Sequence, residues 1–408
     1  MLNIETAEQD PRFAAELTAR VRRAQDRMQE QGFSALIVYG NTKVVGSYRY
    51  LSGNFLDRCG WVSQGPTRDH VTIFDGAAVL VPQSGDPVLL LEPGQMFDQP
   101  QYLADVRGGG LGGGTAGLTP RGVSDVLSEF HARDRVGIET WDRFPTPLYL
   151  GLTELMPDCE FTESTVIEEL RLTKSQVELE LLQRAAEIGD VGHQAIAEVL
   201  SRGDPVSELD AIRVADAAMR QADPLYEDPS VSSPSKIGSG SKVGRWLLHV
   251  PMAGKMIVPG DTVNWDICMR YEGYAIDISR TRVIGKASSD IQRAYEAELQ
   301  MSEALVRAAK PGVPAVQLKH LADQIARDAG FELWENFAGH GIGLDTHERP
   351  DMGVEETELV ENMVLCIEPR IAIDDRWLLG NEDMVVVTPD GGRPLTRFPK
   401  EPLELLEV

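Results

Sequence analysis

The segment DTVNWDICMRYEGYAIDISRTRVIG, residues 261–285, sets two aspartates into two apolar runs separated by a short turn. This pattern predicts a β-hairpin that turns around residues 271–273. In such a hairpin we expect Asp266 and Asp277 to lie opposite one another on one face, with Cβ atoms roughly 5 Å apart. Two carboxylates among apolar residues repel each other and lose hydration unless a cation compensates them. The hairpin therefore predicts a metal site.

Two glutamates stand beside other apolar runs. ENMVLCIEPRI (residues 361–371) places Glu368 at the end of a predicted strand, and GNEDMVVVTPDG (residues 380–391) places Glu382 at the start of another. A single glutamate at a strand end of an acidic protein more often marks a solvated end. Taken together, four carboxylates carry a formal charge that two divalent cations balance, and oxygen-rich ligation favours Mn, Fe or Co.

A third segment, GHGIGLDTHERP at residues 339–350, holds two of the chain's seven histidines, His340 and His347. Glycines beside them indicate close backbone approaches, with Gly341 and Gly343 letting the chain pass near a site. Taken alone, the segment is compatible with a metal site, an acid/base pair or a loop that happens to carry both histidines. The carboxylates elsewhere favour the metal site.

The ordered set Asp, Asp, His, Glu, Glu resembles the ligand set of the pita-bread metallopeptidase family M24, in its creatinase, prolidase and aminopeptidase P branch. The step of eleven residues from Asp266 to Asp277 matches as well, and the resemblance covers roughly residues 165 to 395. It implies two divalent metal ions (Mn, Fe, Co or Zn). The implied metal ligands are Asp266, Asp277, His340, Glu368 and Glu382.

The resemblance also assigns roles. Asp277 and Glu382 would bridge the ions, Asp266 would complete one of them, and His340 with Glu368 would complete the other. Three residues would be catalytic: Glu368 as the proton shuttle, and His347 and His249, the latter in GRWLLHVPMAG (residues 244–254), as groups that orient the substrate and stabilise the tetrahedral intermediate.

The order of the predicted elements gives the fold class. Residues 1–165 alternate helical and apolar strand patterns, which predicts an α/β domain, whereas residues 166–408 mix long helices with hairpins, which predicts an α+β domain. The resemblance implies that the first is a creatinase-like N-terminal domain and that the second is the pita-bread catalytic domain. A GxGxxG match at Gly108, Gly110 and Gly113 is interpreted as a flexible loop, because no strong strand precedes it.

Composition bounds the partners and the compartment. The formal charge of −25 argues against nucleic acid and against an anionic membrane surface. No window approaches the roughly 20 apolar residues of a membrane span, and the polar start argues against a signal peptide, so a cytoplasmic location is expected. The four cysteines show no CxxC spacing, and the two that stand in apolar strands beside carboxylates, Cys268 and Cys366, are interpreted as small buried thiols. The resemblance implies a homodimer.

The expected function is a two-metal hydrolase resembling Xaa-Pro dipeptidase or aminopeptidase P, in which water activated between the ions attacks a small peptide or amide carbonyl. Two departures leave alternatives open: Gly380 stands where proline-specific relatives usually carry Arg, and Arg370 where they carry Gly. The alternatives are a creatinase-like or ectoine-hydrolase-like C–N hydrolase, a dimethylsulfoniopropionate-lyase-like enzyme and, third, a non-catalytic binding module. An insert at residues 54–70 is a surface loop or part of a pocket.

Overall fold

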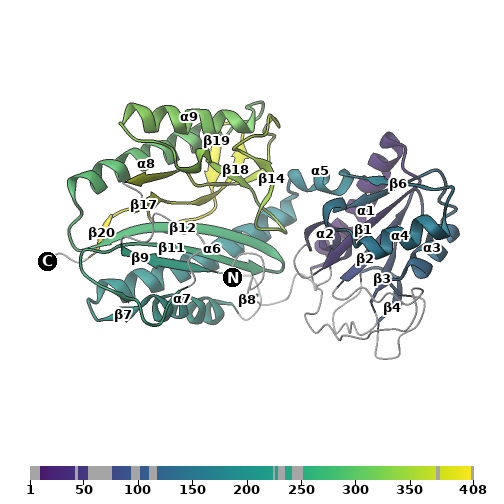
Figure 1. Cartoon of the computed structure of the whole chain (residues 1–408), viewed down its shortest axis with the longest axis horizontal. Helices are drawn as coiled ribbons and strands as arrows, with labels where there is room; N and C mark the ends of the chain where they lie inside the picture. The colour runs from purple at the N-terminus through teal and green to yellow at the C-terminus, as the bar shows by residue number, and fades with distance from the viewer. Residues whose placement is uncertain are drawn as a thin grey trace. The chain divides into compact units, whose positions relative to one another are not determined.

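The chain forms two compact units in a computed structural model, Met1–Arg171 and Leu172–Val408 (Figure 1). The sequence predicts a domain boundary between residues 165 and 166, and the division of the chain into two units falls six residues later, near the end of helix α5 (Val166–Leu172). The structure describes residues 10–41, 45–53, 76–92, 102–109, 117–223, 226–227, 235–240, 251–373 and 377–405.

The first unit is built on a mixed six-stranded sheet with the order β4-β3-β2-β1-β5-β6. Strand β1 runs antiparallel to β2 and parallel to β5, and the buried strands read as near-continuous apolar runs. This arrangement confirms the α/β prediction. Its elements are α1 (Pro11–Gln31), β1 (Ala35–Asn41), α2 (Gly46–Ser52), β2 (Gly76–Pro82), β3 (Val88–Leu91), β4 (Asp105–Gly108), α3 (Pro120–Glu129), β5 (Arg135–Glu139), α4 (Thr146–Leu155), β6 (Glu160–Glu163) and α5 (Val166–Leu172).

Local sequence signals set the ends of helix α1. The Asp10 side chain accepts a hydrogen bond from the Arg12 backbone amide, Pro11 occupies the first helical position, and Gly32 ends the helix with a φ of 74°. Of the predicted glycine loop, Gly108 ends β4 at positive φ, whereas Gly110, Gly113 and the 54–70 insert lie outside the described residues.

Glu139 ends β5 as a fully buried carboxyl group. Its Oε1 accepts hydrogen bonds from Ser164 Oγ (2.6 Å) and from the Ile167 backbone amide (3.1 Å), which ties the sheet to the start of α5. Burial outweighs these hydrogen bonds and raises the pKa of Glu139 from 4.5 to about 7. The folded chain therefore holds this proton more tightly than the unfolded chain does.

The raised pKa of Glu139 predicts a pH dependence of stability. Its contribution is fully present below the unfolded pKa of 4.5 and is lost as the pH rises to about 7, by roughly 3 kcal/mol. Glu139→Gln, which mimics the protonated group, should lose less stability than wild type over this range. Denaturant unfolding of both proteins between these pH values measures the difference, and parallel curves for the two proteins would contradict the prediction.

The second unit contains two five-stranded sheets and long helices, as the α+β prediction requires. One sheet has the order β20-β12-β11-β8 with β9 also paired to β11, and the other has the order β14-β13-β15-β18-β19. Its helices are α6 (Gln176–Ser201), α7 (Glu208–Ala222), α8 (Ser289–Ala308) and α9 (Ala315–Asp328). Its strands are β7 (Val206–Ser207), β8 (Tyr226–Glu227), β9 (Lys236–Ser239), β10 (Met256–Ile257), β11 (Thr262–Tyr271), β12 (Tyr274–Ile284), β13 (Gly339–Gly341), β14 (Glu348–Asp351), β15 (Val364–Ile367), β16 (Arg370–Ile373), β17 (Trp377–Gly380), β18 (Asp383–Thr388), β19 (Gly391–Pro394) and β20 (Glu404–Leu405).

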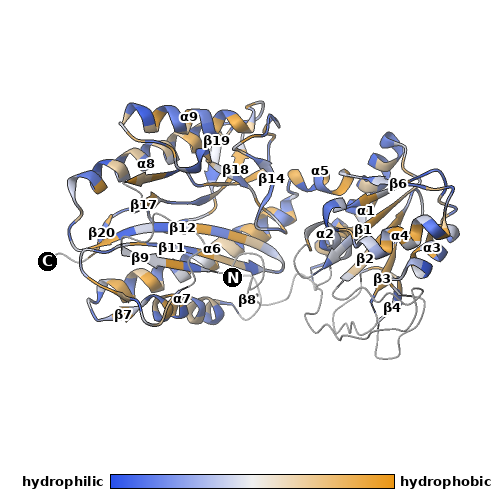
Figure 2. Cartoon of the chain, in the orientation of Figure 1, coloured by the Kyte–Doolittle hydropathy of each residue, from blue (hydrophilic) through white to orange (hydrophobic). Residues whose placement is uncertain are grey.

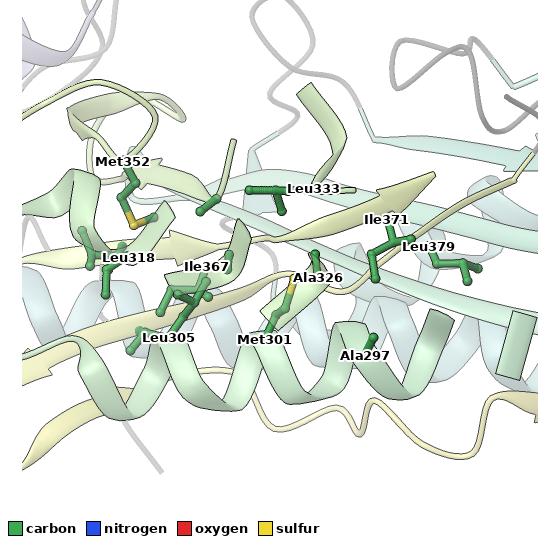
Figure 3. Packing of buried hydrophobic residues seen from close by; sticks show 14 of the residues in the cluster. Ala297, Met301, Leu305, Leu318, Ala326, Leu333, Met352, Ile367, Ile371 and Leu379 are labelled. Carbon is green, nitrogen blue, oxygen red and sulfur yellow. The ribbon is translucent and has the colours of Figure 1, made fainter. Parts of the chain in front are cut away.

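A hydrophobic core joins helices α8 and α9 to the second of these sheets. Both helices carry hydrophobic and hydrophilic residues in alternation along their length (Figure 2). Met301 and Leu305 of α8 belong to the same buried cluster as Ile367 of β15 and Leu379 of β17 (Figure 3). This core fixes β15, which ends directly before Glu368, and β18, which begins directly after Glu382. No helix in the described part of the chain is long and apolar enough to cross a membrane.

The hairpin of β11 and β12 forms as predicted, but its register differs. Its turn is the two-residue pair Glu272–Gly273, both at positive φ (49° and 80°), as a type I′ turn requires. Asp266 consequently pairs with Ser279, and Asp277 pairs with Cys268. The prediction that the two aspartates lie directly opposite each other is therefore wrong. They lie diagonally on the same face, because the shift amounts to two residues and side chains alternate with a period of two.

Candidate metal centre

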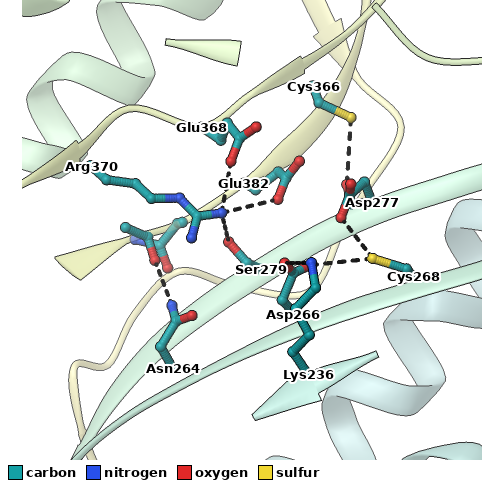
Figure 4. A network of polar contacts seen from close by, with 12 residues as sticks. Lys236, Asn264, Asp266, Cys268, Asp277, Ser279, Cys366, Glu368, Arg370 and Glu382 are labelled. Atoms are coloured by element: carbon teal, nitrogen blue, oxygen red, sulfur yellow. Dashed lines mark hydrogen bonds and ion pairs between the residues drawn. The ribbon is translucent and has the colours of Figure 1, made fainter. Parts of the chain in front are cut away.

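The five residues predicted as metal ligands converge in the second unit, and all five are buried. Asp266 and Asp277 come from the hairpin, and His340 is the middle residue of β13. Glu368 directly follows β15, and Glu382 directly precedes β18. The cluster therefore draws on both sheets of the second unit (Figure 4).

Backbone hydrogen bonds hold the two glutamates in place. The backbone amide of Glu382 donates to the Ser279 carbonyl of β12 (2.9 Å), and this hydrogen bond connects the two five-stranded sheets. The amide of Glu368 donates to the Ala338 carbonyl beside β13, also at 2.9 Å. Each carboxylate is thereby positioned through its own main chain.

The glycines around His340 allow neighbouring strands to approach it. Gly339 has a φ of 140°, and a Cβ atom there would collide with the Cys366 carbonyl of β15. A Cβ atom on Gly341 would collide with the Arg349 carbonyl of β14, and one on Gly343 would lie 2.8 Å from the Glu348 carboxylate. The predicted close approaches exist, and they bring other strands against β13.

The imidazole of His340 is oriented as a metal ligand needs to be. Its Nδ1 lies 2.9 Å from the Gly341 carbonyl oxygen, which places the proton on Nδ1 and leaves Nε2 with a free lone pair. Nε2 lies 3.3 Å from Glu368 Oε1, 3.8 Å from Glu382 Oε1 and 4.0 Å from Asp277 Oδ2. The free lone pair of His340 Nε2 and the carboxylates of Asp277, Glu368 and Glu382 thus face the same small space.

The carboxylates oppose one another's ionisation. Burial and then Asp266 raise the pKa of Asp277 well above its usual range, and burial with Asp277 and Glu368 does the same for Glu382. Burial alone would raise the pKa of Asp266, but Lys236 and then Arg370 lower it to about 2. The cluster can ionise fully only when further positive charge is present.

Two basic side chains lie against the cluster. Lys236 Nζ of β9 is 3.2 Å from Asp266 Oδ2, and Asp266 is the main reason that the pKa of Lys236 is raised. Arg370 of β16 lies 2.7 Å from Glu368 Oε2 and 3.5 Å from Glu382 Oε2 through its NH2 group. The sequence reading left the Arg370 side chain unplaced and missed Lys236. The sequence around Lys236 does not indicate that this residue pairs with Asp266 of β11, 30 residues further along the chain.

Two of the cysteines lie beside the same carboxylates. Cys268 Sγ is 3.1 Å from Asp277 Oδ1 and 3.7 Å from Asp266 Oδ1, and Cys366 Sγ is 3.7 Å from the Asp277 carbonyl oxygen. Both thiols are fully buried, as the sequence predicts. Burial, followed by Glu382, raises the pKa of Cys366 well above its usual range, so this side chain stays a neutral thiol.

Of the two histidines predicted to be catalytic, His347 lies among the described residues and His249 does not. The His347 ring lies 4.2 Å from the His340 ring, centre to centre, and its side chain is exposed at the rim of the cluster. Desolvation and then His340 lower the pKa of His347 to about 4, so the ring is neutral at pH 7. His249 lies outside the described residues.

The donor set fits divalent metal ions. Among the described residues, His340 Nε2 and Glu382 Oε1 are buried without a hydrogen-bond partner. A buried, unpaired acceptor costs about 1–3 kcal/mol, and a cation placed between these atoms removes that cost. Carboxylate oxygens with one imidazole are ligands typical of Mn, Fe, Co and Zn.

Both halves of the chain match known family descriptions. Residues 180–389 match the description "Metallopeptidase family M24", and residues 20–173 match "Creatinase/Prolidase N-terminal domain". A protein of Pyrococcus furiosus named Xaa-Pro dipeptidase is 34% identical over 238 residues, which cover 58% of this chain and 66% of the relative. The chain thus aligns with about two thirds of that relative's length.

Solved structures show the same fold over nearly the whole chain. The dipeptidase PepE of Mycobacterium ulcerans has a TM-score of 0.75 at 25% identity, with 96% of this chain and 98% of that chain covered. An Xaa-Pro dipeptidase of Bacillus anthracis has a TM-score of 0.74 at 23% identity, with 95% and 100% covered. These similarities confirm the predicted pita-bread architecture with a preceding α/β domain.

Proposed function

Because this chain belongs to metallopeptidase family M24, we propose that it is a dipeptidase that uses two divalent metal ions to hydrolyse Xaa-Pro dipeptides. The observation that carries the proposal is the buried convergence of three carboxylates, those of Asp277, Glu368 and Glu382, on the unpaired Nε2 atom of His340. The name of the Pyrococcus furiosus relative supplies the substrate class. Mn, Fe, Co and Zn are the candidate ions.

The same five side chains would hold the ions. Asp277 and Glu382 lie 4.0 and 3.8 Å from His340 Nε2, and the family resemblance implies that these two residues would bridge the ions. Asp266 would complete one ion, and His340 with Glu368 would complete the other. Ions bound here supply a Lewis acid for the scissile carbonyl and make a water molecule more acidic.

Glu368 and His347 would carry out the proton transfer and the orientation of the substrate. Arg370 holds Glu368 Oε2, and Oε1 faces the cluster, where it can take a proton from the attacking water and pass it to the leaving amine. His347 is neutral and exposed at the rim, so its N–H can donate to the carbonyl oxygen as negative charge develops there. His249 is proposed to share this role.

The alternative functions are less well supported. The Gly380 departure motivated a specialised C–N hydrolase or a lyase, yet Arg370 brings a guanidinium to Glu368 and Glu382 from another strand. The similar proteins named above are dipeptidases, which favours peptide hydrolysis. A binding module without catalysis is disfavoured because all five ligand residues are present.

The proposed activity is tested on purified protein loaded separately with Mn²⁺, Co²⁺ or Zn²⁺. Proline release is measured from Ala-Pro, Leu-Pro and Met-Pro, with Ala-Ala and creatine as comparison substrates. We expect Xaa-Pro hydrolysis, and we expect Glu368→Gln to lower kcat by about 100-fold or more, the scale of a lost proton shuttle. Turnover of creatine without turnover of any dipeptide would instead establish the small-molecule alternative.

Two further properties remain predictions. A homodimer is expected from the resemblance to the creatinase and prolidase branch, and size-exclusion chromatography with light scattering measures it. A cytoplasmic location is likewise proposed, as the sequence predicts.

A further inference from the structure

A two-residue link between two strands carries one of the proposed metal ligands. Asn381 and Glu382 connect β17, which pairs with β16, to β18 of the second five-stranded sheet, and neither residue belongs to a strand. Both residues are buried. Regular ladder hydrogen bonds therefore do not fix the Glu382 carboxylate, and other contacts must satisfy the backbone of this link and hold it in place.

Glu298 of helix α8 holds the link through both of its carboxylate oxygens. Its Oε1 accepts a hydrogen bond from the Asn381 backbone amide (3.1 Å), and its Oε2 accepts one from Asn381 Nδ2 (2.5 Å). Asn381 Oδ1 in turn accepts hydrogen bonds from the Thr281 backbone amide of β12 (3.4 Å) and from the Tyr295 hydroxyl group of α8 (3.3 Å). Asn381 is thereby held between α8 and β12, directly before the proposed ligand.

Strand β12 holds the main chain of Glu382 itself. The Glu382 amide donates to the Ser279 carbonyl (2.9 Å), and the Glu382 carbonyl accepts a hydrogen bond from Arg280 NH1 (2.7 Å). The link is therefore fastened from two directions, since β12 holds Glu382 and α8 holds the residue before it.

The carboxyl group of Glu298 is unusual for its place on the helix. Glu298 is fully buried, and it is the only charged residue among the buried residues of α8. Its neighbours Ala297 and Met301 belong to the hydrophobic cluster (Figure 3). A buried charge is costly even when it is hydrogen-bonded, and an apolar side chain often stabilises such a core equally well or better. Stability alone therefore does not account for a glutamate at this position.

We propose that Glu298 is a positioning residue, which holds Asn381 and thereby fixes the carboxylate of Glu382 where the metal ions bind. The inference rests on the proposed metal-dependent function and adds to it a residue outside the predicted ligand set. Residues that orient a metal ligand typically change metal affinity by about 10- to 100-fold when they are lost.

The test is a metal-binding titration of the full chain, which does not depend on activity. Mn²⁺ is titrated calorimetrically into chelator-treated wild type and into Glu298→Gln, in which only one of the two end groups can accept a hydrogen bond from Asn381. Burial raises the pKa of Glu298 to about 7, so the titrations are run at about pH 8, where both oxygens of wild type accept. We expect the variant to bind Mn²⁺ about tenfold or more weakly than wild type.

A reversed pair tests the hydrogen bond itself. In Glu298→Gln with Asn381→Asp, the glutamine NH2 group can donate to the aspartate, and the glutamine oxygen can still accept from the backbone amide. Asn381→Asp alone places two carboxylates against each other. We expect the reversed pair to bind Mn²⁺ more tightly than either single variant, and a double-mutant cycle separates this coupling from the effect of the added charge.

A variant of the same helix is the control for loss of stability. Met301→Ala removes a fully buried side chain from the hydrophobic cluster, so we expect it to lower stability and to bind Mn²⁺ like wild type. Circular dichroism establishes that each variant is folded before titration, and denaturant unfolding measures its stability.

The outcomes are distinguishable. Equal Mn²⁺ affinity of wild type and Glu298→Gln, or an equal loss of affinity in Met301→Ala, overturns the inference while leaving the proposed dipeptidase intact. If Glu298→Gln does not fold, the reversed pair and Asn381→Asp decide, and equal affinity of these two overturns the inference. Failure of wild type to bind Mn²⁺, Co²⁺ or Zn²⁺ overturns the metal-dependent function, and with it this inference.

Discussion

Asp277→Asn is expected to abolish stable metal binding and to lower kcat/KM for dipeptides by more than about 100-fold. The loss of an outer partner of a metal ligand already costs about 10- to 100-fold, and Asp277 is proposed to bridge both ions. Its Oδ2 lies 4.0 Å from His340 Nε2, and its Oδ1 lies 3.1 Å from Cys268 Sγ. Asp277 thus lies near both His340 and Cys268, on the two sides of the cluster.

The same substitution should stabilise the metal-free protein. Asparagine keeps the shape of the side chain, and it removes a buried carboxyl group whose ionisation burial and Asp266 oppose and whose charge raises the pKa of Glu382. Metal-free Asp277→Asn is therefore expected to melt at a higher temperature than metal-free wild type, whereas added metal should stabilise only wild type. Calorimetry with and without chelator measures both effects. Full metal retention by the variant would remove Asp277 from the ligand set.

The second large effect concerns the guanidinium of Arg370. Removing it by Arg370→Gly leaves Glu368 and Glu382 without their shared cation, and loss of one partner of a buried ion pair costs about 3–5 kcal/mol. We expect lower stability and a loss of metal affinity of about 10- to 100-fold, as for other partners of metal ligands.

The strand opposite Arg370 offers a rescue of this variant. Arg370 and Gly380 are direct partners in the ladder of β16 and β17, and a Cβ atom on Gly380 would lie 2.5 Å from Arg370 Cγ. Only one of the two positions has room for a long side chain. Gly380→Arg alone should therefore be unstable, whereas the exchange Arg370→Gly with Gly380→Arg should recover much of the metal affinity.

A double-mutant cycle across these four proteins measures the coupling. Metal affinity from calorimetry and unfolding free energy from denaturation are both recorded, since a purely structural role of Arg370 would change only the second. Additive losses in both quantities would contradict a shared role of the two positions.

The hairpin of β11 and β12 illustrates how far the sequence alone predicts the site. Apolar runs around a Gly-containing turn correctly predicted two paired strands with both aspartates on one face. The direct pairing was wrong because it requires a turn centred between residues 271 and 272, whereas the observed turn, Glu272–Gly273, is centred one residue further along the chain. A register error of two residues preserves the face, so the metal-site hypothesis survived it.

Contacts between distant strands were beyond prediction. Glu368 and Glu382 were predicted at strand ends, and they lie directly beside the ends of β15 and β18. This prediction was possible because the limits of an apolar run can be read from the local sequence. Lys236 and Arg370 reach the cluster only through pairings of β9 with β11 and of β16 with β17. Neither pairing leaves a local mark on the sequence, and so the charge balance of the site was predicted without its two cations.

The placement of the ligand residues on strands has an evolutionary consequence. All five proposed ligand residues lie within a strand or directly beside one, where an inserted residue would turn side chains to the wrong face. Insertions are therefore excluded from the segments that hold the chemistry and are tolerated in loops. Descendants of such a protein can acquire new substrates by exchanging loops while they inherit the ligand set unchanged.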